Sequence, residues 1–205
     1  KLWTADTAFD LDGDFYQGKG VYSLPHPVQP KMPIINAAGS EEGRAFAMRN
    51  ADFLFTPVFD FDQAKATVAD ITERAASVNR EVDVLTFCTV VCRPTQQEAD
   101  DYLNWYAEEQ ADWEAVDNLM TLQGMHAQSF TPEALALYRD RMAAGHGGFP
   151  LVGTPDTIAD LLEKLSETGI AGTTLAFVDY AKEFPYFRQE VLPRLEAKGL
   201  RQPVN

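Results

Sequence analysis

The sequence predicts an α/β protein built on a parallel sheet, and three features of the chain support this. Apolar segments of strand length alternate with amphipathic segments of helix length along most of the 205 residues, a pattern typical of β/α units. The segment 82–92 is apolar and rich in β-branched residues on both faces, as expected for a strand that is covered on both sides. A hydrophobic content of 45% is enough for one domain with a sizeable core.

The first part of the chain lies outside this alternation. Residues 1–4 are predicted to be the end of a helix that begins upstream. The segment 9–16 alternates and then turns at Asp12-Gly13, which predicts a small hairpin or a loop excursion. Three prolines within 23–31 predict an extended approach to the first core strand.

A β/α/β unit is predicted within 33–56, and its turn is the most informative stretch of the sequence. Gly39 would let the backbone approach a ligand closely. Ser40 offers a hydroxyl and a backbone N–H group where the helix begins, which suits a phosphate. An ordinary helix cap is the alternative interpretation, and the acidic pair Glu41 and Glu42 fits it because acids complement the helix dipole.

The remaining units follow in order. One helix is expected in 61–79 and a long helix from Pro94 to about Trp113, whose aromatic side chains should pack on the sheet. The segment 119–150 is a lid-like excursion, with a helix over 132–143 and a flexible glycine-rich hinge at 145–148. Thr154 and Pro155 begin a further helix, and a last helix covers about 184–198. The four strands are expected in 34–38, 51–56, 82–92 and 172–178.

Four strands alternating with helices form either a small open sheet or half of an eight-stranded (β/α)8 barrel, which usually needs about 250 residues. The start of the chain at Lys1, inside a helix-like segment, favours the half-barrel. Residues 1–205 are therefore expected to be the C-terminal half of one (β/α)8 TIM barrel, with an excursion before the last β/α unit.

Composition restricts the partners. The chain has 17 Lys and Arg against 31 Asp and Glu, a formal net charge of -14, which disfavours nucleic acids and anionic membranes. Its apolar runs are shorter than the roughly 20 residues of a membrane span. Cys88 and Cys92 share one predicted strand, about 13 Å apart, too far for a disulfide. Free thiols fit a cytoplasmic location, and the scattered histidines suggest no metal motif.

A set of short segments occurs in a characteristic order and spacing along almost the whole chain. They are Leu2-Trp3-Thr4 with Phe9, Gly13 and Phe15-Tyr16; Pro27-Val28-Gln29-Pro30 with Pro33; Ala38-Gly39-Ser40 with Gly43, Ala47 and Ala51-Asp52; Leu151-Val152-Gly153-Thr154-Pro155; and Phe177-Val178-Asp179-Tyr180 with Val191-Leu192-Pro193. Together they resemble the C-terminal half of the bacterial luciferase-like flavin-dependent monooxygenases. Ala51-Asp52-Phe53 and the end of the last strand point to the branch of pyrimidine and dimethylsulfone monooxygenases.

This resemblance implies a (β/α)8 barrel with FMN at the carboxyl ends of its strands. Members of the family take reduced FMN from a separate flavin reductase and use O2 to oxygenate a small organic substrate. The N-terminal half of the barrel would be a companion segment, and a homo-oligomer is expected. Two alternatives stay open: a deazaflavin-dependent oxidoreductase of the same superfamily, and a non-catalytic flavin-binding partial barrel.

The resemblance also assigns site residues. Gly39 and Ser40 would hold the FMN phosphate, and Phe177, Asp179 and Tyr180 would form part of the pocket wall, although Asp179 could equally cap the last helix. The segment 123–149 would correspond to the mobile active-site loop of the family. The first four strands of the family are absent, so no catalytic residue is assigned.

Overall fold

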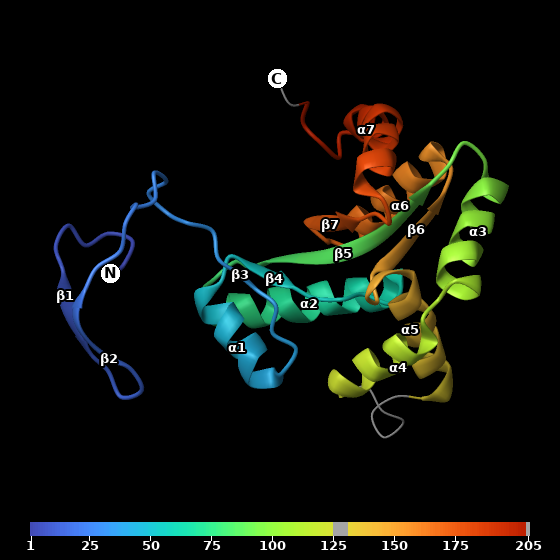
Figure 1. Cartoon of the computed structure of the whole chain (residues 1–205). Coiled ribbons are helices and arrows are strands. Elements are labelled where there is room, and N and C mark those ends of the chain that lie inside the picture. The colour runs from blue at the N-terminus through green and yellow to red at the C-terminus, as the bar shows by residue number, and fades with distance from the viewer. Residues whose placement is uncertain (125–130, 204–205) are drawn as a thin grey trace. The chain divides into compact units, whose positions relative to one another are not determined.

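The computed structural model describes residues 1–124 and 131–203. Residues from Lys1 to Ile34 form one compact unit, and the chain from Ile35 onward forms another. The second unit is an α/β structure with a parallel sheet (Figure 1), as the sequence predicts.

The first unit is a β-hairpin. Strands β1 (Phe9–Asp12) and β2 (Gln17–Val21) pair in antiparallel fashion, and the Gly13 N–H donates to the Tyr16 carbonyl across the turn at 3.1 Å. The predicted hairpin is therefore confirmed. The predicted helix end at residues 1–4 is only a single turn, closed by the N–H groups of Thr4 and Ala5 on the Lys1 carbonyl.

The second unit contains the four predicted strands, all parallel. β3 (Ile35–Asn36) pairs with β4 (Phe53–Phe55), β4 pairs with β5 (Asp83–Cys92), and β5 pairs with β7 (Gly172–Ala176). Spatial order thus follows chain order among these strands. The helices between and after them are α1 (Glu41–Asn50), α2 (Phe61–Ser77), α6 (Pro155–Glu167) and α7 (Tyr180–Ala197).

A fifth strand, β6 (Phe149–Gly153), was not predicted. Leu85 pairs with both β4 and β7, and Cys88 pairs with both β6 and β7. β4 and β6 therefore share one edge of β5. β4 pairs only with residues 83–85, so the rest of that edge needs another partner for its backbone groups. The sequence did contain one indication of this extra strand: the apolar run at 82–92 is too long to be paired along its whole length by the short strand β4.

The long helix predicted from Pro94 to about Trp113 is wrong in its second half. α3 (Gln96–Asn104) continues into a π-helical turn, η1 (Trp105–Glu109), and then the helix stops. The Asp112 carboxylate accepts a hydrogen bond from the Ala115 N–H and begins a separate helix, α4 (Trp113–Leu122). Asp112 was the overlooked cap. The excursion continues with α5 (Pro132–Gly145), beside α4 in Figure 1; residues 125–130 lie outside the described residues.

The two faces of the sheet differ. On the face toward α2, α6 and α7, alternate strand residues such as Leu54, Val84 and Cys88 are fully buried in the main core with Ile71, Ile158 and Phe187. The opposite face carries Phe55 and Phe87, stacked with ring centroids 6.0 Å apart and only partly buried. In a closed barrel this second face would be the interior.

The predicted hinge at residues 145–148 is instead a tightly packed turn. His146 adopts the left-handed conformation (φ 56°), and its N–H donates to the Met142 carbonyl at 3.1 Å. A Cβ atom on Gly145 would overlap Thr89 Cγ2, and one on Gly148 would lie 3.0 Å from the Phe87 ring. Glycine is needed here because the turn lies directly against β5.

Among the hydrogen bonds that hold α5 in place, two come from side chains far apart in the sequence. The Arg141 guanidinium donates to the Phe59 carbonyl at 2.8 Å, at the carboxyl end of β4. The Tyr106 hydroxyl, from η1, donates to the Ala144 carbonyl at 3.0 Å. The first bond thus attaches α5 to the loop between β4 and α2, and the second joins η1 to α5 within the excursion.

We predict that Gly145→Ala lowers the free energy of unfolding by about 2–5 kcal/mol. Forcing a side chain into a positive-φ position costs about 1–2 kcal/mol, and the overlap with Thr89 adds overpacking of about 1–3 kcal/mol. Gly199→Ala is the matched control, because Gly199 also has a positive φ (73°) but no atom within 4 Å of an added Cβ. Urea unfolding of both variants measures the difference, and equal losses would contradict the packing role of Gly145.

Candidate functional site at the carboxyl edge of the sheet

The carboxyl ends of the parallel strands lie along one edge of the sheet, the edge where ligands bind in α/β folds. The turn after β3 carries Gly39 and Ser40, and the turn after β7 carries Phe177, Asp179 and Tyr180. β4 and β5 stand between these two turns in the sheet. The predicted site residues therefore share one edge of the sheet but form two separate groups.

Ser40 is the N-cap of α1. Its backbone is extended (φ -76°, ψ 159°), and its Oγ accepts a hydrogen bond from the Gly43 N–H at 3.1 Å. The side chain of Asn36 shapes the preceding turn by accepting from the Ala38 N–H at 2.9 Å. Gly43 is required because a Cβ there would lie 2.5 Å from the Ala38 Cβ. The helix start is thus built by local side-chain bonds and close backbone packing.

This helix start is open to an anion. Ser40 is exposed, and a Cβ atom added at Gly39 would meet nothing within 4 Å. The first N–H groups of any helix lack an intrahelical acceptor, and the helix dipole favours negative charge there. The neighbouring Glu41 carboxylate forms an ion pair with Arg74 of α2, which offsets its charge. The arrangement can therefore hold a phosphate through backbone donors and the Ser40 hydroxyl.

At the end of β7 the three predicted residues have different surroundings. Phe177 is buried, with its ring edge-on to Phe187 at 5.4 Å. Asp179 is the N-cap of α7 and accepts from the Lys182 N–H at 3.2 Å; the hydrogen bond from the Lys182 side chain lowers the pKa of this carboxyl. Tyr180 is exposed and donates its hydroxyl to the Leu175 carbonyl at 3.2 Å. Asp179 thus has the capping role given as the alternative.

Sequence reasoning missed a buried ion pair that joins the ends of β5 and β7. The Glu183 side chain is only 8% exposed, and one oxygen accepts from Arg93 at 2.7 Å. Its other oxygen accepts from the backbone N–H groups of Val178 at 3.1 Å and Asp179 at 3.3 Å. The Arg93 guanidinium lies 3.9 Å from the centre of the Tyr102 ring. The only feature of the sequence that indicated this ion pair was the acidic residue Glu183, near the start of the last helix.

A small cavity of about 140 Å³ lies next to these residues, between β5, β7 and the excursion. On the sheet side the cavity is lined by Thr89, Phe177 and Val178. On the other side it is closed by Tyr106 of η1 and Gly145 of α5. Burial raises the pKa of Tyr106 to about 12, so its phenol stays neutral at ordinary pH. Thr89 and Tyr106 were not singled out as site residues from the sequence, because only the fold brings them together.

The cysteines take no part in this site. Both are buried and free, and burial raises the pKa of each thiol to about 11. The Thr173 hydroxyl donates to the Cys88 sulfur at 3.1 Å. Among residues 1–124 and 131–203, no three or more His, Cys, Asp or Glu side chains are grouped to hold a metal. None of the helices in these ranges combines the length and apolarity needed to cross a bilayer.

Comparison with known proteins identifies the family. The family described as luciferase-like monooxygenase matches residues 1–172 of the chain. The chain belongs to this family. Its membership confirms the resemblance inferred from the ordered segments. The matched residues contain all of those segments except the last group, which begins at Phe177.

Individual members of the luciferase-like family give more detail. An FMNH2-dependent dimethylsulfone monooxygenase from Pseudomonas fluorescens (strain Pf0-1) is 31% identical over 208 residues, covering 97% of this chain and 56% of the relative. A pyrimidine monooxygenase from Caulobacter vibrioides (strain NA1000 / CB15N) is 25% identical, over 92% of this chain and 54% of its own length. Both kinds of enzyme in the predicted branch, the dimethylsulfone and the pyrimidine monooxygenases, are thus among the relatives of this chain. This chain spans about half the length of the curated relatives it matches.

Solved structures of the family share the fold. The crystal structure of a long-chain alkane monooxygenase superposes with a TM-score of 0.75 at 25% identity, over 97% of this chain and 48% of that one. A structure from Hyphomicrobium sulfonivorans gives a TM-score of 0.76 at 23% identity, over 92% of this chain and 46% of that one; at this identity the likeness informs the fold alone.

We predict that Glu183→Ala lowers the free energy of unfolding by about 3 kcal/mol, because it leaves Arg93 unpaired and two backbone N–H groups without their acceptor. Lys182→Ala is the control, since its pair with Asp179 is exposed (85% for the Lys182 side chain) and such pairs contribute about 0–1 kcal/mol. Chemical denaturation of both variants tests this. Similar losses would show that the buried pair has no special role.

Proposed function

We propose that the chain is the C-terminal half of the (β/α)8 barrel of a reduced-FMN-dependent monooxygenase. It would act on a small organic substrate with O2, and a separate flavin reductase would supply the reduced flavin. The names of the relatives support the cofactor, because one that matches 97% of the chain is named FMNH2-dependent. The parallel order β3-β4-β5-β7 with external helices supports the barrel.

The observation that carries this proposal is the open helix start at Gly39 and Ser40. It lies at the carboxyl edge of the sheet, and it offers backbone N–H donors and a hydroxyl where an anion is favoured. A Cβ atom added at Gly39 would lie more than 4 Å from every protein atom beyond its chain neighbours. The residues present therefore fit the phosphate of FMN, and they would hold the cofactor at the mouth of the barrel.

Bound reduced FMN would supply the electrons that let O2 react with the substrate. The chain's own residues would hold the phosphate of the cofactor and form part of the pocket wall. Ser40 would orient the phosphate by a hydrogen bond, and the Glu41–Arg74 pair would keep the Glu41 charge from opposing it. Phe177, held by the aromatic rings of α7, would form an apolar wall that excludes water from one side of the pocket.

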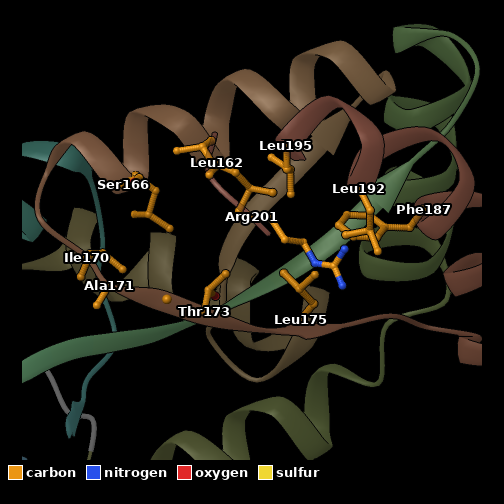
Figure 2. A pocket seen from close by; sticks show the side chains of 13 residues that line it. Leu162, Ser166, Ile170, Ala171, Thr173, Leu175, Phe187, Leu192, Leu195 and Arg201 are labelled. Carbon is orange, nitrogen blue, oxygen red and sulfur yellow. The ribbon is translucent and has the colours of Figure 1, made fainter. Parts of the chain in front are cut away.

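The half-barrel part of the proposal is supported by the sheet edges. β3 pairs only with β4, and β7 only with β5, among the described residues. A cavity of about 280 Å³ lies between β7, α6 and α7 (Figure 2). Leu162, Leu175 and Leu195 line it, and Arg201 lies among them in the view. A strand and side chains of the N-terminal half would pair with β7 beside this cavity and cover it.

We predict that Ser40→Asp abolishes or strongly weakens FMN binding while leaving the fold intact. Aspartate is an equally good helix cap, but its carboxylate would repel the phosphate. Ser40→Ala should weaken binding less, because one hydrogen bond to a charged group contributes about 1.5–3 kcal/mol and the backbone donors remain. Gly39→Ala should also weaken binding without affecting folding, since the added methyl meets only the ligand. Flavin titration of the barrel reassembled from its two halves measures all three.

Thr131→Asp is the control for these variants. Thr131 caps α5 through the Ala134 N–H, as Ser40 caps α1, so the variant adds the same charge at a different helix start. It should bind FMN like the parent, and thermal unfolding should show all four variants folded. If Ser40→Asp binds FMN as tightly as the parent, the phosphate lies elsewhere, and the turns after β5 or β7 become the candidates.

The chain alone is expected to associate or to unfold without cooperativity, because both outer strands have an open edge. Mixing it with the N-terminal half should give a 1:1 complex that unfolds cooperatively. Sedimentation and thermal unfolding of the separate and mixed halves provide the measurement. A stable, cooperatively unfolding monomer of this chain by itself would reject the half-barrel.

Oxygen consumption tests the reaction class. The reassembled barrel, given chemically reduced FMN and a panel of small neutral and charged organic compounds, should consume O2 and form an oxygenated product from some of them. A deazaflavin-dependent oxidoreductase would instead transfer hydride without O2, and a non-catalytic flavin-binding barrel would show binding without product. Either result would overturn the monooxygenase assignment.

A further inference from the structure

The cavity between β5, β7 and the excursion has a lining that is unusually free of charge for so acidic a chain. Thr89, Tyr106, Phe177 and Val178 are among the residues around it, and none carries a formal charge at neutral pH. The nearest charged groups described above, Arg93 and Glu183, neutralise each other at 2.7 Å. The Tyr102 ring covers the Arg93 guanidinium and contacts Tyr106 at 5.3 Å between ring centres.

Thr89 and Tyr106 are the two lining residues whose side chains carry a hydroxyl group. The Tyr106 hydroxyl donates its proton to the Ala144 carbonyl, so its ring is held in a fixed position. The Thr89 hydroxyl takes part in none of the side-chain hydrogen bonds found in residues 1–124 and 131–203, although Thr89 is only 6% exposed. A nearly buried hydroxyl beside a cavity retains a proton to donate to a bound molecule.

Two segments of irregular backbone, the π-helical turn η1 and the turn at Gly145, form one side of the cavity. η1 is a π-helical turn, and such turns are rare and frequent at functional sites. It directs Tyr106 into the cavity while the adjacent Trp105 stays half exposed and lines a different surface. In the second segment, Gly145 approaches the Thr89 methyl group so closely that no side chain fits between them.

We infer that this cavity binds a compact, uncharged part of the substrate that carries a hydrogen-bond acceptor, with the Thr89 hydroxyl as its donor. The inference rests on the proposed function, because it specifies the substrate of the same barrel. Its volume of about 140 Å³ is below the roughly 300–1,000 Å³ of sites for drug-sized ligands, so it holds only a few heavy atoms. A sulfonate or carboxylate would lose its water there without gaining a cation.

The test compares two probes of similar size, dimethyl sulfone and methanesulfonate, titrated onto the FMN-free reassembled barrel. NMR shifts of the cavity methyl groups report binding. Dimethyl sulfone should bind at least about tenfold more tightly than methanesulfonate. Thr89→Val, which keeps the shape and removes the hydroxyl, should weaken sulfone binding about tenfold, the effect of one hydrogen bond, and Thr89→Ser should restore most of it.

Thr86→Val is the matched control. Thr86 lies on the same strand, three residues away and on the opposite face, and its buried hydroxyl is without a partner. This variant should bind the sulfone like the parent. The inference is overturned if Thr89→Val binds the sulfone as tightly as the parent, or if methanesulfonate binds equally well.

These outcomes are independent of the flavin. Sulfone binding that persists in Ser40→Asp, when FMN no longer binds, would separate the cavity from the phosphate site. If the parent barrel binds no FMN but discriminates the sulfone from the sulfonate, only the flavin proposal is rejected. If the parent barrel binds FMN but does not discriminate between them, only the assignment of this cavity is rejected.

Discussion

Ten consecutive residues of β5 need hydrogen-bond partners along both edges, and three other strands provide them. β7 pairs with residues 85–89 along one edge, while β4 pairs with 83–85 and β6 with 88–92 along the other. The helix-facing side chains of β5 are buried under α2, α6 and α7. The main core therefore forms around this strand, and the turns that carry the candidate site are positioned by the places where its neighbours end.

The excursion follows from the same constraint. Because β4 pairs only with the first part of β5, the chain after β5 must return to supply β6, and it does so through α3, η1, α4 and α5. α4 and α5 have a small core of their own around Val116, Met120 and Met142. Gly145 and Tyr106 then meet Thr89 at the carboxyl half of β5, where they close a cavity that the regular β/α units do not form.

The electrostatics of the site differ from those of the whole chain. A formal net charge of -14 repels anions at long range, yet the helix start at Ser40 is suited to one through oriented backbone dipoles. The buried Arg93–Glu183 pair contributes no net charge, because each partner is compensated within the fold. Specific recognition here depends on local donors, whereas the acidic surface limits nonspecific binding.

The sequence alone determined the alternation of strands and helices, the cap at Ser40 and the buried strand at 82–92, because periodicity and capping are local properties of the chain. Tertiary structure decided the rest. β6 exists because β5 is longer than β4, the turn at Gly145 is rigid because it lies against Thr89, and Glu183 is buried because Arg93 reaches it from a position 90 residues away. Thr89 and Tyr106 share a cavity for the same reason: their proximity depends on contacts between segments distant in sequence, and no local pattern records such contacts.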